Sequence, residues 1–295
     1  MKILITGALG YIGSETLSRF ANRPEVTIYA VDNDANAIRD RGAYFLRFPN
    51  IKIINCDITD WDQVQQLPTA DIVVHLAATV GYLTASTNPD LTHNTNVVGT
   101  TNIARLGIPT VFFSTGSVYG KIGDACDETV PVNPQTVYAK TKYLGESIVQ
   151  ANPYAIFRPA TAFGLSFKTR HDLIVHDLAS QAVNNGHIEL YQPTARRSFY
   201  SVHKLAELIE YACDKFDLFQ NNIYNVGCES GNVMKKDIVD LLQQQVDFTC
   251  TLVDGADADT RDYNVSYNKL KQVWPNHNEI FSVMIPRIVE YYKQW

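Results

Sequence analysis

Five short apolar runs, each followed by a longer amphipathic stretch, constrain the fold of the first part of the chain. The runs lie at residues 2–6, 26–31, 51–55, 72–75 and 110–114; they are rich in β-branched residues and continuously apolar. Strands of this kind are typical of a parallel sheet that is covered on both faces. Helices are predicted between them at about residues 12–22, 60–67, 92–106 and 136–151. The alternation predicts an α/β fold with a doubly wound parallel sheet, whose ligand-binding loops follow the strands along one edge.

The pattern changes after about residue 160. Helices are predicted near residues 172–185, 203–214, 233–245 and 279–293, and short strands near 188–191 and 223–226. Because no stretch rich in Pro, Gly or Ser separates the two parts, we expect the second to pack on the first as a smaller lobe, with a cleft between them. The first unit is expected to comprise residues 1–160 plus parts of 190–230, and the second lobe mainly residues 161–295.

Composition and charge exclude several classes of protein. Hydrophobic residues make up 45% and charged residues 19% of the chain, which is the balance of a globular protein with a sizeable core. The formal net charge of −6 makes a broad nucleic-acid-binding face unexpected. No run of about 18 apolar residues is available to span a membrane, and the first residues do not have the pattern of a signal peptide. The five cysteines are scattered without a CxxC pair, so we expect a cytoplasmic protein without a metal site.

A glycine-rich turn stands between the first predicted strand and the first predicted helix. It reads Gly7-Ala8-Leu9-Gly10-Tyr11-Ile12-Gly13, with one more residue between the first two glycines than in GxGxxG. Glycine permits the tight turn and lets backbone N–H groups approach a pyrophosphate, while the positive end of the helix dipole faces the anion. A plain strand-to-helix turn is the alternative, but the position directly after the first strand favours a phosphate loop.

Two acidic residues follow the next two predicted strands. Asp32 ends the second strand, where a carboxylate can accept hydrogen bonds from both ribose hydroxyls of an adenosine. The same carboxylate would repel a 2′-phosphate, so the sequence favours NAD over NADP. Asp57-Ile58 follows the third strand and could contact the adenine. The alternatives are that Asp32 is a cap or turn residue and that Asp57 caps a loop.

Tyr138 and Lys142 are four residues apart on a predicted helix, so their side chains lie on one face. A phenol, with an ordinary pKa of about 10, is a poor base at neutral pH. A nearby ammonium and an oxidised nicotinamide both favour the phenolate, so Tyr138 could take the proton of a substrate hydroxyl while hydride passes to the nicotinamide. Exposed helical pairs have the same spacing, so the spacing alone does not identify a site.

A hydroxyl-rich turn precedes this helix. The predicted strand 110–114 runs into Ser114-Thr115-Gly116-Ser117. Thr115 is the candidate for a hydrogen bond to the same substrate oxygen as Tyr138, and Ser114 is expected beside the nicotinamide. An ordinary strand-end turn rich in Ser and Gly is the alternative.

These features together resemble the extended short-chain dehydrogenase/reductase family, specifically its NAD-dependent nucleotide-sugar epimerase/dehydratase group. The resemblance runs through most of the chain as an ordered set of motifs: TGALGYIG, Asp32, Asp57-Ile58, His75-Leu76-Ala77-Ala78, Asn88-Pro89, Asn96-Val97-Val98-Gly99-Thr100, Ser114-Thr115, Val118-Tyr119-Gly120, Tyr138, Lys142, Arg158-Pro159 and Asn225-Val226-Gly227. It implies a Rossmann-type, NAD-binding sheet domain and a smaller C-terminal α/β lobe that binds the nucleotide-sugar.

The resemblance also implies roles for individual residues. Tyr138 would be the general base, Lys142 would hold the nicotinamide ribose and lower the tyrosine pKa, and Thr115 would polarise the C4 oxygen of the sugar. The implied cofactor-binding residues are Gly7, Gly10, Tyr11, Ile12, Gly13, Asp32, Asp57, Ile58, Leu76, Ala77, Ala78, Asn96, Ser114, Tyr138 and Lys142. The implied substrate-binding residues are Thr115, Thr161, Arg197 and Arg261, of which the arginines would meet the diphosphate. A solvated surface charge is the alternative for each arginine.

The chain departs from the family pattern around the substrate. Dehydratases of this group carry an acid pair after the catalytic threonine, whereas this chain has Gly116 and Ser117, so the loss of water has no evident proton donor. Other changes leave the identity of the sugar and the base open: Thr161 for a frequent asparagine, Leu165 for proline, Ser201 for histidine and Lys204 for aspartate. His171-Asp172 could touch the sugar, although a helix start with an exposed histidine is the simpler interpretation.

The leading interpretation is an NAD-dependent nucleotide-sugar epimerase, an isomerase that acts at C4 through a transient 4-keto sugar. The alternatives are a 4-ketoreductase or decarboxylase on the same scaffold and, from another class, a non-catalytic dinucleotide sensor. The resemblance further implies a homodimer through the helices near 92–106 and 138–151. Burial against the chain's own sheet would explain their apolar residues equally well: Val97, Val98, Ile103, Tyr143, Leu144 and Ile148.

Overall fold

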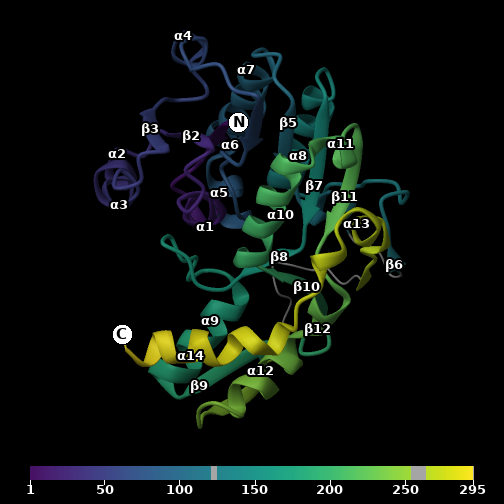
Figure 1. Cartoon of the computed structure of the whole chain (residues 1–295). Coiled ribbons are helices and arrows are strands. Elements are labelled where there is room, and N and C mark those ends of the chain that lie inside the picture. Colours follow the sequence, from purple (N-terminus) through teal and green to yellow (C-terminus); the bar gives the residue numbers. More distant parts are fainter. Residues whose placement is uncertain (121–124, 254–263, 295) are drawn as a thin grey trace.

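The computed structural model describes residues 1–120, 125–253 and 264–294. Its centre is a parallel sheet in the order β11-β7-β5-β4-β1-β2-β3, with helices on both faces (Figure 1). The strands are β1 (Lys2–Thr6), β2 (Thr27–Asp32), β3 (Ile51–Asn55), β4 (Ile72–His75), β5 (Thr110–Phe113), β7 (Tyr154–Pro159) and β11 (Asn222–Val226). The predicted α/β fold with a doubly wound parallel sheet is confirmed.

The predicted strands agree closely with the observed ones in the first part of the chain. Strands 2–6, 51–55 and 72–75 have the expected bounds, β2 is displaced by one residue, and β5 ends at Phe113 instead of Ser114. The sequence prediction did not include β7. Arg158 interrupts its apolar run, and this charge is compatible with a central strand because it pairs with a buried carboxylate described below.

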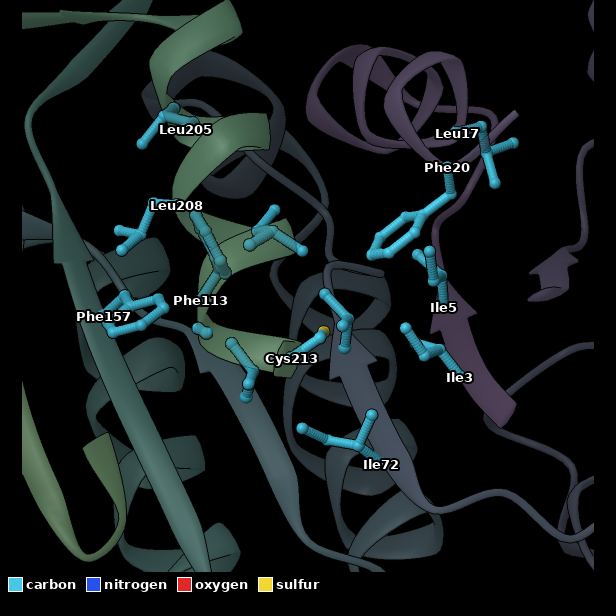
Figure 2. Close-up of a cluster of buried hydrophobic side chains, with 14 of the residues drawn as sticks. Ile3, Ile5, Leu17, Phe20, Ile72, Phe113, Phe157, Leu205, Leu208 and Cys213 are labelled. Atoms are coloured by element: carbon cyan, nitrogen blue, oxygen red, sulfur yellow. The ribbon is translucent and has the colours of Figure 1, made fainter. Parts of the chain in front are cut away.

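One face of the sheet is covered by α1 (Tyr11–Phe20) and α10 (Val202–Asp214), which pack against each other (Figure 2). Ile3 and Ile5 of β1 belong to the core beneath these helices, whereas Leu4 belongs to a separate cluster with Ile103 of α7 (Thr100–Ala104). Successive side chains of a strand point to opposite faces, so a continuously apolar strand supplies both layers. The side chains that α1 and α10 contribute to the core include Leu17, Phe20, Leu205 and Leu208.

The remaining helices of this part are short, apart from α8 (Val137–Val149). The helix predicted at 92–106 is a run of α6 (Pro89–His93), a π-helical turn (Asn94–Gly99) and α7, and it packs against α8. The predicted helix 60–67 is reduced to α4 (Trp61–Val64), which Asp60 caps. The sequence prediction did not include α5 (Tyr82–Thr87), nor the segment of α2 (Ala35–Ala37), a π-helical turn (Ile38–Gly42) and α3 (Ala43–Phe45).

The strands outside the main sheet form three small sheets among the described residues. They are β8 (Thr161–Phe163), β10 (Arg196–Ser201) and β12 (Asn232–Met234) in one, β9 (His187–Tyr191) with β13 (Thr249–Val253), and β6 (Ala125–Cys126) with β14 (Asn264–Val265). A separate apolar core lies between β9, β10 and three helices: α9 (Ile174–Ser180), α12 (Lys235–Gln243) and α14 (Ile285–Lys293). A π-helical turn (Gln181–Asn185) extends α9, and a 3-10 turn (Phe281–Met284) precedes α14.

The chain returns to the main sheet after the second lobe has begun. α10 covers the main sheet and β11 pairs with β7, while the short helices α11 (Phe216–Phe219) and α13 (Asn268–Val273) lie near this edge. The two lobes are therefore interleaved in sequence and lie next to each other in space (Figure 1). Among the described residues, no helix is both long and apolar enough to cross a membrane.

Candidate active site

A cavity of about 940 Å³ lies at the carboxyl ends of the main sheet's strands. Residues that follow β1, β2, β3, β4, β5 and β7 line it, together with the start of α8 and the segment after β8. In doubly wound sheets, ligands bind at this edge, near the point where the strand order reverses. Here the order reverses between β1 and β4, so the cavity lies on the predicted edge.

The glycine loop forms one wall of the cavity and allows very close packing. Gly7 has a φ of +66°, and a Cβ at this position would lie 2.7 Å from the backbone nitrogen of Ala77. A Cβ on Gly13 would lie 2.2 Å from the carbonyl oxygen of Gly7. The N-cap of α1 is Gly10, which has no side chain to cap the helix. The positive end of α1 therefore faces the cavity as an anion site.

Asp32 lies at the end of β2, and its carboxylate also lines the cavity. One oxygen accepts a hydrogen bond from the backbone N–H of Leu9 at 2.9 Å, and the other accepts one from the N–H of Asp34 at 3.1 Å. Asp32 therefore ties the glycine loop to the turn after β2, as expected for a turn residue. Asp32 also lines the cavity, where a carboxylate can accept hydrogen bonds from the hydroxyls of a ribose.

Asp57 and Ile58 line the same part of the cavity. One oxygen of Asp57 accepts hydrogen bonds from the backbone N–H of Thr59 at 2.9 Å and from its hydroxyl at 2.8 Å. Burial alone would raise the pKa of this carboxyl, but the Thr59 bonds outweigh burial and lower it. Asp57 thus caps its loop in addition to facing the cavity.

The loop after β4 brings Leu76, Ala77 and Ala78 to the cavity. Asn96, a predicted cofactor-binding residue, is buried and is not among the lining residues. Its side chain accepts from the N–H of Thr79 at 2.8 Å and donates to the carbonyl of Thr79 and the hydroxyl of Thr141, both at 3.0 Å. Asn96 therefore fastens the β4 loop to α8.

The two ends of the cavity are separated by several strands. Asp32 follows β2 and Thr115 follows β5, and three strand spacings lie between them, or about 14 Å. The anion site at the start of α1 lies between these ends, because β1 lies between β2 and β4. The carboxylate of Asp32, the anion site at the start of α1 and the hydroxyls of Ser114 and Thr115 follow one another along this edge. This order fits the adenosine, pyrophosphate and nicotinamide of an extended dinucleotide.

Tyr138 and Lys142 both line the cavity at the β5 end, as do Ser114 and Thr115. The hydroxyl of Thr136 accepts the backbone N–H of Ala139 at 3.1 Å and so caps α8 just before Tyr138. The first turn of α8 therefore begins at a defined point and presents Tyr138 and Lys142 to one space. The structure brings these four sequence-predicted residues together.

Lys142 is almost completely buried, with 3% of its surface exposed. Its Nζ lies 4.2 Å from the centroid of the Phe112 ring. Burial lowers the pKa of Lys142 to about 7, and the Glu146 carboxylate one turn further along α8 opposes this shift. Burial, and to a lesser extent the Lys142 charge, lower the pKa of His75 to about 3, so His75 is a neutral neighbour.

A buried ion pair lies beneath the Ser114 side chain. Arg158 donates from Nε to Glu146 Oε1 at 2.9 Å and from Nη2 to Glu146 Oε2 at 2.6 Å. Ser114 Oγ donates to Glu146 Oε1 at 2.5 Å, and Arg158 Nη1 donates to the Tyr119 hydroxyl at 2.9 Å. Burial alone would lower the pKa of Arg158, but the pairing with Glu146 raises it above the usual value.

The sequence analysis did not assign a role to Glu146. It occurs four residues after Lys142 and eight after Tyr138, a spacing that places all three near one face of a helix. That spacing was the available signal, but nothing local identified Arg158 as its partner. Because Glu146 contacts Ser114 and acts electrostatically on Lys142, it supports the residues that line the cavity.

The predicted substrate residues are distributed unevenly. Thr115 lines the cavity, and its hydroxyl also accepts the N–H of Ser117 at 3.2 Å, which caps a 3-10 turn (Gly116–Tyr119). Thr161 lines the cavity from β8. Arg197 is only 4% exposed on β10, where Nη1 donates to the carbonyl of Arg196 at 2.9 Å, and it is not among the lining residues. It is therefore not a solvated surface charge. Arg261 lies outside the described residues.

Two basic residues line the cavity without having been predicted, Lys168 and Arg170. Arg170 forms a two-pronged ion pair with Asp172, at 2.6 and 2.5 Å. The His171 ring accepts or donates a hydrogen bond to the Tyr292 hydroxyl at 2.9 Å and stacks on Tyr291. His171 and Asp172 are not among the lining residues; the basic residue next to them is. No local pattern marks Lys168 or Arg170, because the loop that carries them has no regular structure.

Comparison with known proteins agrees with this geometry. The model of the NAD dependent epimerase/dehydratase family matches residues 3–227. A putative UDP-glucose 4-epimerase of Methanocaldococcus jannaschii is 30% identical over 178 residues, which cover 55% of this chain and 56% of that relative. The match thus spans little more than half of that relative's length. UDP-glucuronic acid decarboxylase 6 of Arabidopsis thaliana is 23% identical over 290 residues, 92% of this chain and 83% of the relative.

A solved structure shows the same fold over the whole chain. The UDP-glucuronic acid 4-epimerase of Bacillus cereus, in complex with UDP-glucuronic acid and NAD, superposes with a TM-score of 0.88 at 21% identity. The superposition covers 100% of this chain and 99% of that one. At this level of identity the likeness establishes the fold.

Proposed function

Because the chain belongs to the NAD dependent epimerase/dehydratase family, we propose that it is a nucleotide-sugar epimerase that inverts C4 through a transient 4-keto sugar. The observation that carries this proposal is one cavity that holds the glycine loop and Asp32 together with Thr115, Tyr138 and Lys142. A binding module that only senses a dinucleotide needs the glycine loop, Asp32 and an ammonium that holds the ribose, but it has no use for the phenol of Tyr138 beside the hydroxyl of Thr115.

The residues present supply the acid–base half of the reaction. When bound, NAD would supply an acceptor and then a donor of hydride at the sugar carbon. Tyr138 takes the proton of the C4 hydroxyl, and the ammonium of Lys142 favours the phenolate that does so. Thr115 donates a hydrogen bond to the same oxygen and orients it. When the 4-keto sugar presents its other face, Tyr138 returns the proton to the C4 oxygen, so no net oxidation results.

The charges along the cavity favour this reaction over dehydration. Of the described lining residues, only Asp32 and Asp57 carry carboxylates, and both lie at the adenosine end. At the β5 end the positions after Thr115 are Gly116 and Ser117. Loss of a C6 hydroxyl as water requires a proton donor there, and a glycine and a serine do not supply one. Lys168 supplies a positive charge, which suits a diphosphate, whereas the charge of Arg170 is paired with Asp172.

A decarboxylase or a 4-ketoreductase is the second candidate. Decarboxylation also proceeds through oxidation at C4, so the residues used for epimerisation would serve it equally well. The match to an Arabidopsis decarboxylase, which covers 92% of this chain, supports decarboxylation as the second candidate reaction. A reductase differs in consuming external reduced cofactor.

A panel of nucleotide-sugars distinguishes these reactions. We would incubate the purified protein with UDP-, dTDP-, GDP- and CDP-sugars, uronic acids and 4-keto sugars included, without cofactor, with NAD and with NADPH, and follow the products by NMR. We expect one sugar to change configuration at C4 with no accumulation of NADH. Release of CO2 would identify a decarboxylase, and conversion only with stoichiometric NADPH would identify a reductase. If no sugar turns over under any of these conditions, the epimerase proposal is wrong.

We further propose that two copies of the chain associate through α6, α7 and α8. Three large apolar side chains on these elements are exposed and lie outside the cavity lining: Leu144 at 47%, Val98 at 38% and Tyr143 at 37%. Ile103, in contrast, is buried within the chain's own core. Burial against the chain's own sheet therefore explains Ile103 but not Val98, Tyr143 and Leu144, which a second copy would cover.

Replacing Leu144 by glutamate should separate the two copies. A charge in a buried symmetric interface would be introduced twice, once in each protomer, and left unpaired. We expect light scattering coupled to size exclusion to give twice the mass of one chain for the parent protein and one chain for Leu144→Glu. Leu252→Glu, at a 66% exposed position on β13, is the matched control. An unchanged mass for Leu144→Glu, or a monomeric parent protein, would contradict this interface.

A cytoplasmic location is part of the same proposal. All five cysteines are free thiols, and four of them are buried. Unpaired thiols of this kind suit a reducing compartment.

A further inference from the structure

Residues 164–173, which connect β8 to α9 and contribute Lys168, Arg170 and Leu173 to the cavity lining, are called the strap below. They follow the second lobe's β8 but are bonded to the first turn of α1. Ser166 Oγ donates to the carbonyl oxygen of Tyr11 at 2.8 Å and lies 3.0 Å from Ser14 Oγ. The Tyr11 hydroxyl donates back to the carbonyl oxygen of Gly164 at 2.6 Å. The strap is therefore fastened at the anion site of the glycine loop.

These bonds are held in place from both sides. The carbonyl oxygen of Gly164 also accepts from His176 Nε2 at 3.0 Å. Burial raises the pKa of the Tyr11 phenol well above its usual value, so this hydroxyl remains a donor at ordinary pH. Thr169 Oγ1 donates to the carbonyl of Ser166 at 2.8 Å and accepts its N–H at 3.1 Å, which closes a compact turn.

A second anchor lies on the adenosine side. The Phe167 ring is 4.8 Å from the ring of Tyr44 and 5.2 Å from that of Phe45, measured between centroids, and both belong to α3. Phe45 is fully buried, while Phe167 remains 45% exposed. Figure 1 shows the connection between β8 and α9 extending toward the side of the molecule that carries α1 and α3. An aromatic side chain on an irregular loop thus joins the two lobes.

The other end of the strap lies on the catalytic side. Lys168, Arg170 and Leu173 line the cavity. A Cβ on Gly81, after β4, would lie 3.6 Å from Arg170 Nη2, and Arg170 interacts electrostatically with Tyr138. Along the chain the strap therefore contacts α1 through Gly164 and Ser166, then α3 through Phe167, and then reaches the neighbourhood of Tyr138 through Arg170. These contacts extend along the same edge of the sheet that separates Asp32 from Thr115.

We propose that the strap retains the dinucleotide: its anchors on α1 and α3 must detach before the cofactor can enter or leave. The inference rests on the cofactor assignment but not on the sugar reaction. A cofactor that is oxidised and reduced within one turnover gains from slow release, because each release would interrupt the cycle. The anchors contact α1 and α3, away from the reacting atoms. They therefore affect the entry and release of the cofactor and not the chemical step.

Rates of NADH binding test the strap directly. Stopped-flow fluorescence would follow the association of NADH, and its displacement by excess NAD, in the parent protein and in Phe167→Ala. Two aromatic contacts are lost, so we expect both rates to rise by about tenfold, while Kd changes by less than about threefold. Leu218→Ala, a 49% exposed leucine on α11, is the matched control and should leave both rates unchanged.

A reversible cross-link provides the opposite test. Ser14→Cys with Ser166→Cys replaces the neighbouring hydroxyls by thiols that can form a disulfide. We expect oxidation to slow NADH release by more than about tenfold and reduction to restore it, with Ser166→Cys alone insensitive to oxidation.

Rates within about twofold of the parent in Phe167→Ala would overturn the proposal. A rise in the dissociation rate alone would also overturn it, because Phe167 would then stabilise the bound state without obstructing passage.

The outcome for the strap is independent of the outcome for the epimerase. NADH fluorescence is measured without a sugar, so a protein that converts none of the panel still yields both rates. Conversely, turnover without any effect of the strap variants would leave the epimerase proposal intact.

Discussion

Tyr138→Phe should abolish most turnover while NADH binding is retained. The substitution removes only the hydroxyl, so the ring still fills its place at the start of α8 next to the cavity. General acid–base catalysis contributes about 10²- to 10⁴-fold, and here one group serves both the oxidation and the return step. We therefore expect kcat to fall by about 10³-fold with the substrate identified by NMR, and Kd for NADH to stay within about twofold.

Thr115→Val is the companion to this variant. In the proposed reaction Thr115 orients the same oxygen but exchanges no proton. Its loss should therefore reduce kcat by about tenfold, the value of one hydrogen bond to a charged group. The hydroxyl also caps the turn Gly116–Tyr119, so thermal unfolding must be measured alongside.

A Tyr138→Phe protein with more than about a tenth of the parent kcat would mean that another group moves the proton. If kcat and NADH binding fell together, Tyr138 would be a binding residue instead.

The parts of the fold that the sequence predicted are those that local patterns determine. Ile3, Leu4 and Ile5 are all fully buried, and a strand buried on both faces cannot alternate. The glycine turn was also predicted from its sequence pattern. The pattern is informative because only glycine fits at position 13, where a Cβ would lie 2.2 Å from the carbonyl oxygen of Gly7. Spacing and position at a strand end singled out Tyr138, Lys142 and Thr115, and all three line the cavity.

The parts that were missed depend on contacts between distant segments. Arg158 is compatible with β7 only because Glu146 approaches it from α8. Arg197 was predicted to meet the diphosphate, yet pairing of β10 with β8 and β12 buries it, and it is not among the residues that line the cavity. The strap has no periodicity of its own, and its path is set by bonds to α1 that span more than 150 positions, such as Tyr11 to Gly164. No pattern in a short window records such a pairing.

Glu146 and Arg158 should show the second large effect, this time on stability. Their side chains are 1% and 4% exposed, so removing one partner leaves the other charge buried and unpaired. Such a loss costs about 3–5 kcal/mol, and we expect Glu146→Leu to lower Tm by about 10 °C. Replacing both by leucine removes the pair without leaving a charge, so the double variant should recover most of the lost Tm. If the double variant were no more stable than Glu146→Leu, the unpaired charge of Arg158 would not be the cause of the lost stability.

The same pair should set the pH range of activity through Lys142. With a pKa of about 7, Lys142 is close to losing its proton at neutral pH, and a neutral amine no longer favours the Tyr138 phenolate. In Glu146→Gln the opposing carboxylate is gone and the Arg158 cation remains, so the pKa of Lys142 falls further. In Arg158→Met the carboxylate is no longer neutralised, so the pKa of Lys142 rises.

The alkaline limb of kcat should therefore move in opposite directions in the two variants. We expect it about one pH unit lower in Glu146→Gln and about one unit higher in Arg158→Met, measured at a temperature where both are folded. The residues that face Lys142 include Tyr138 and Glu146 on α8, His75 on β4 and Phe112 on β5; burial keeps His75 neutral, so it does not titrate in this range. Loss of rigidity alone would reduce kcat in both variants without moving the limb. Shifts of the same sign would mean that Lys142 is not the titrating group.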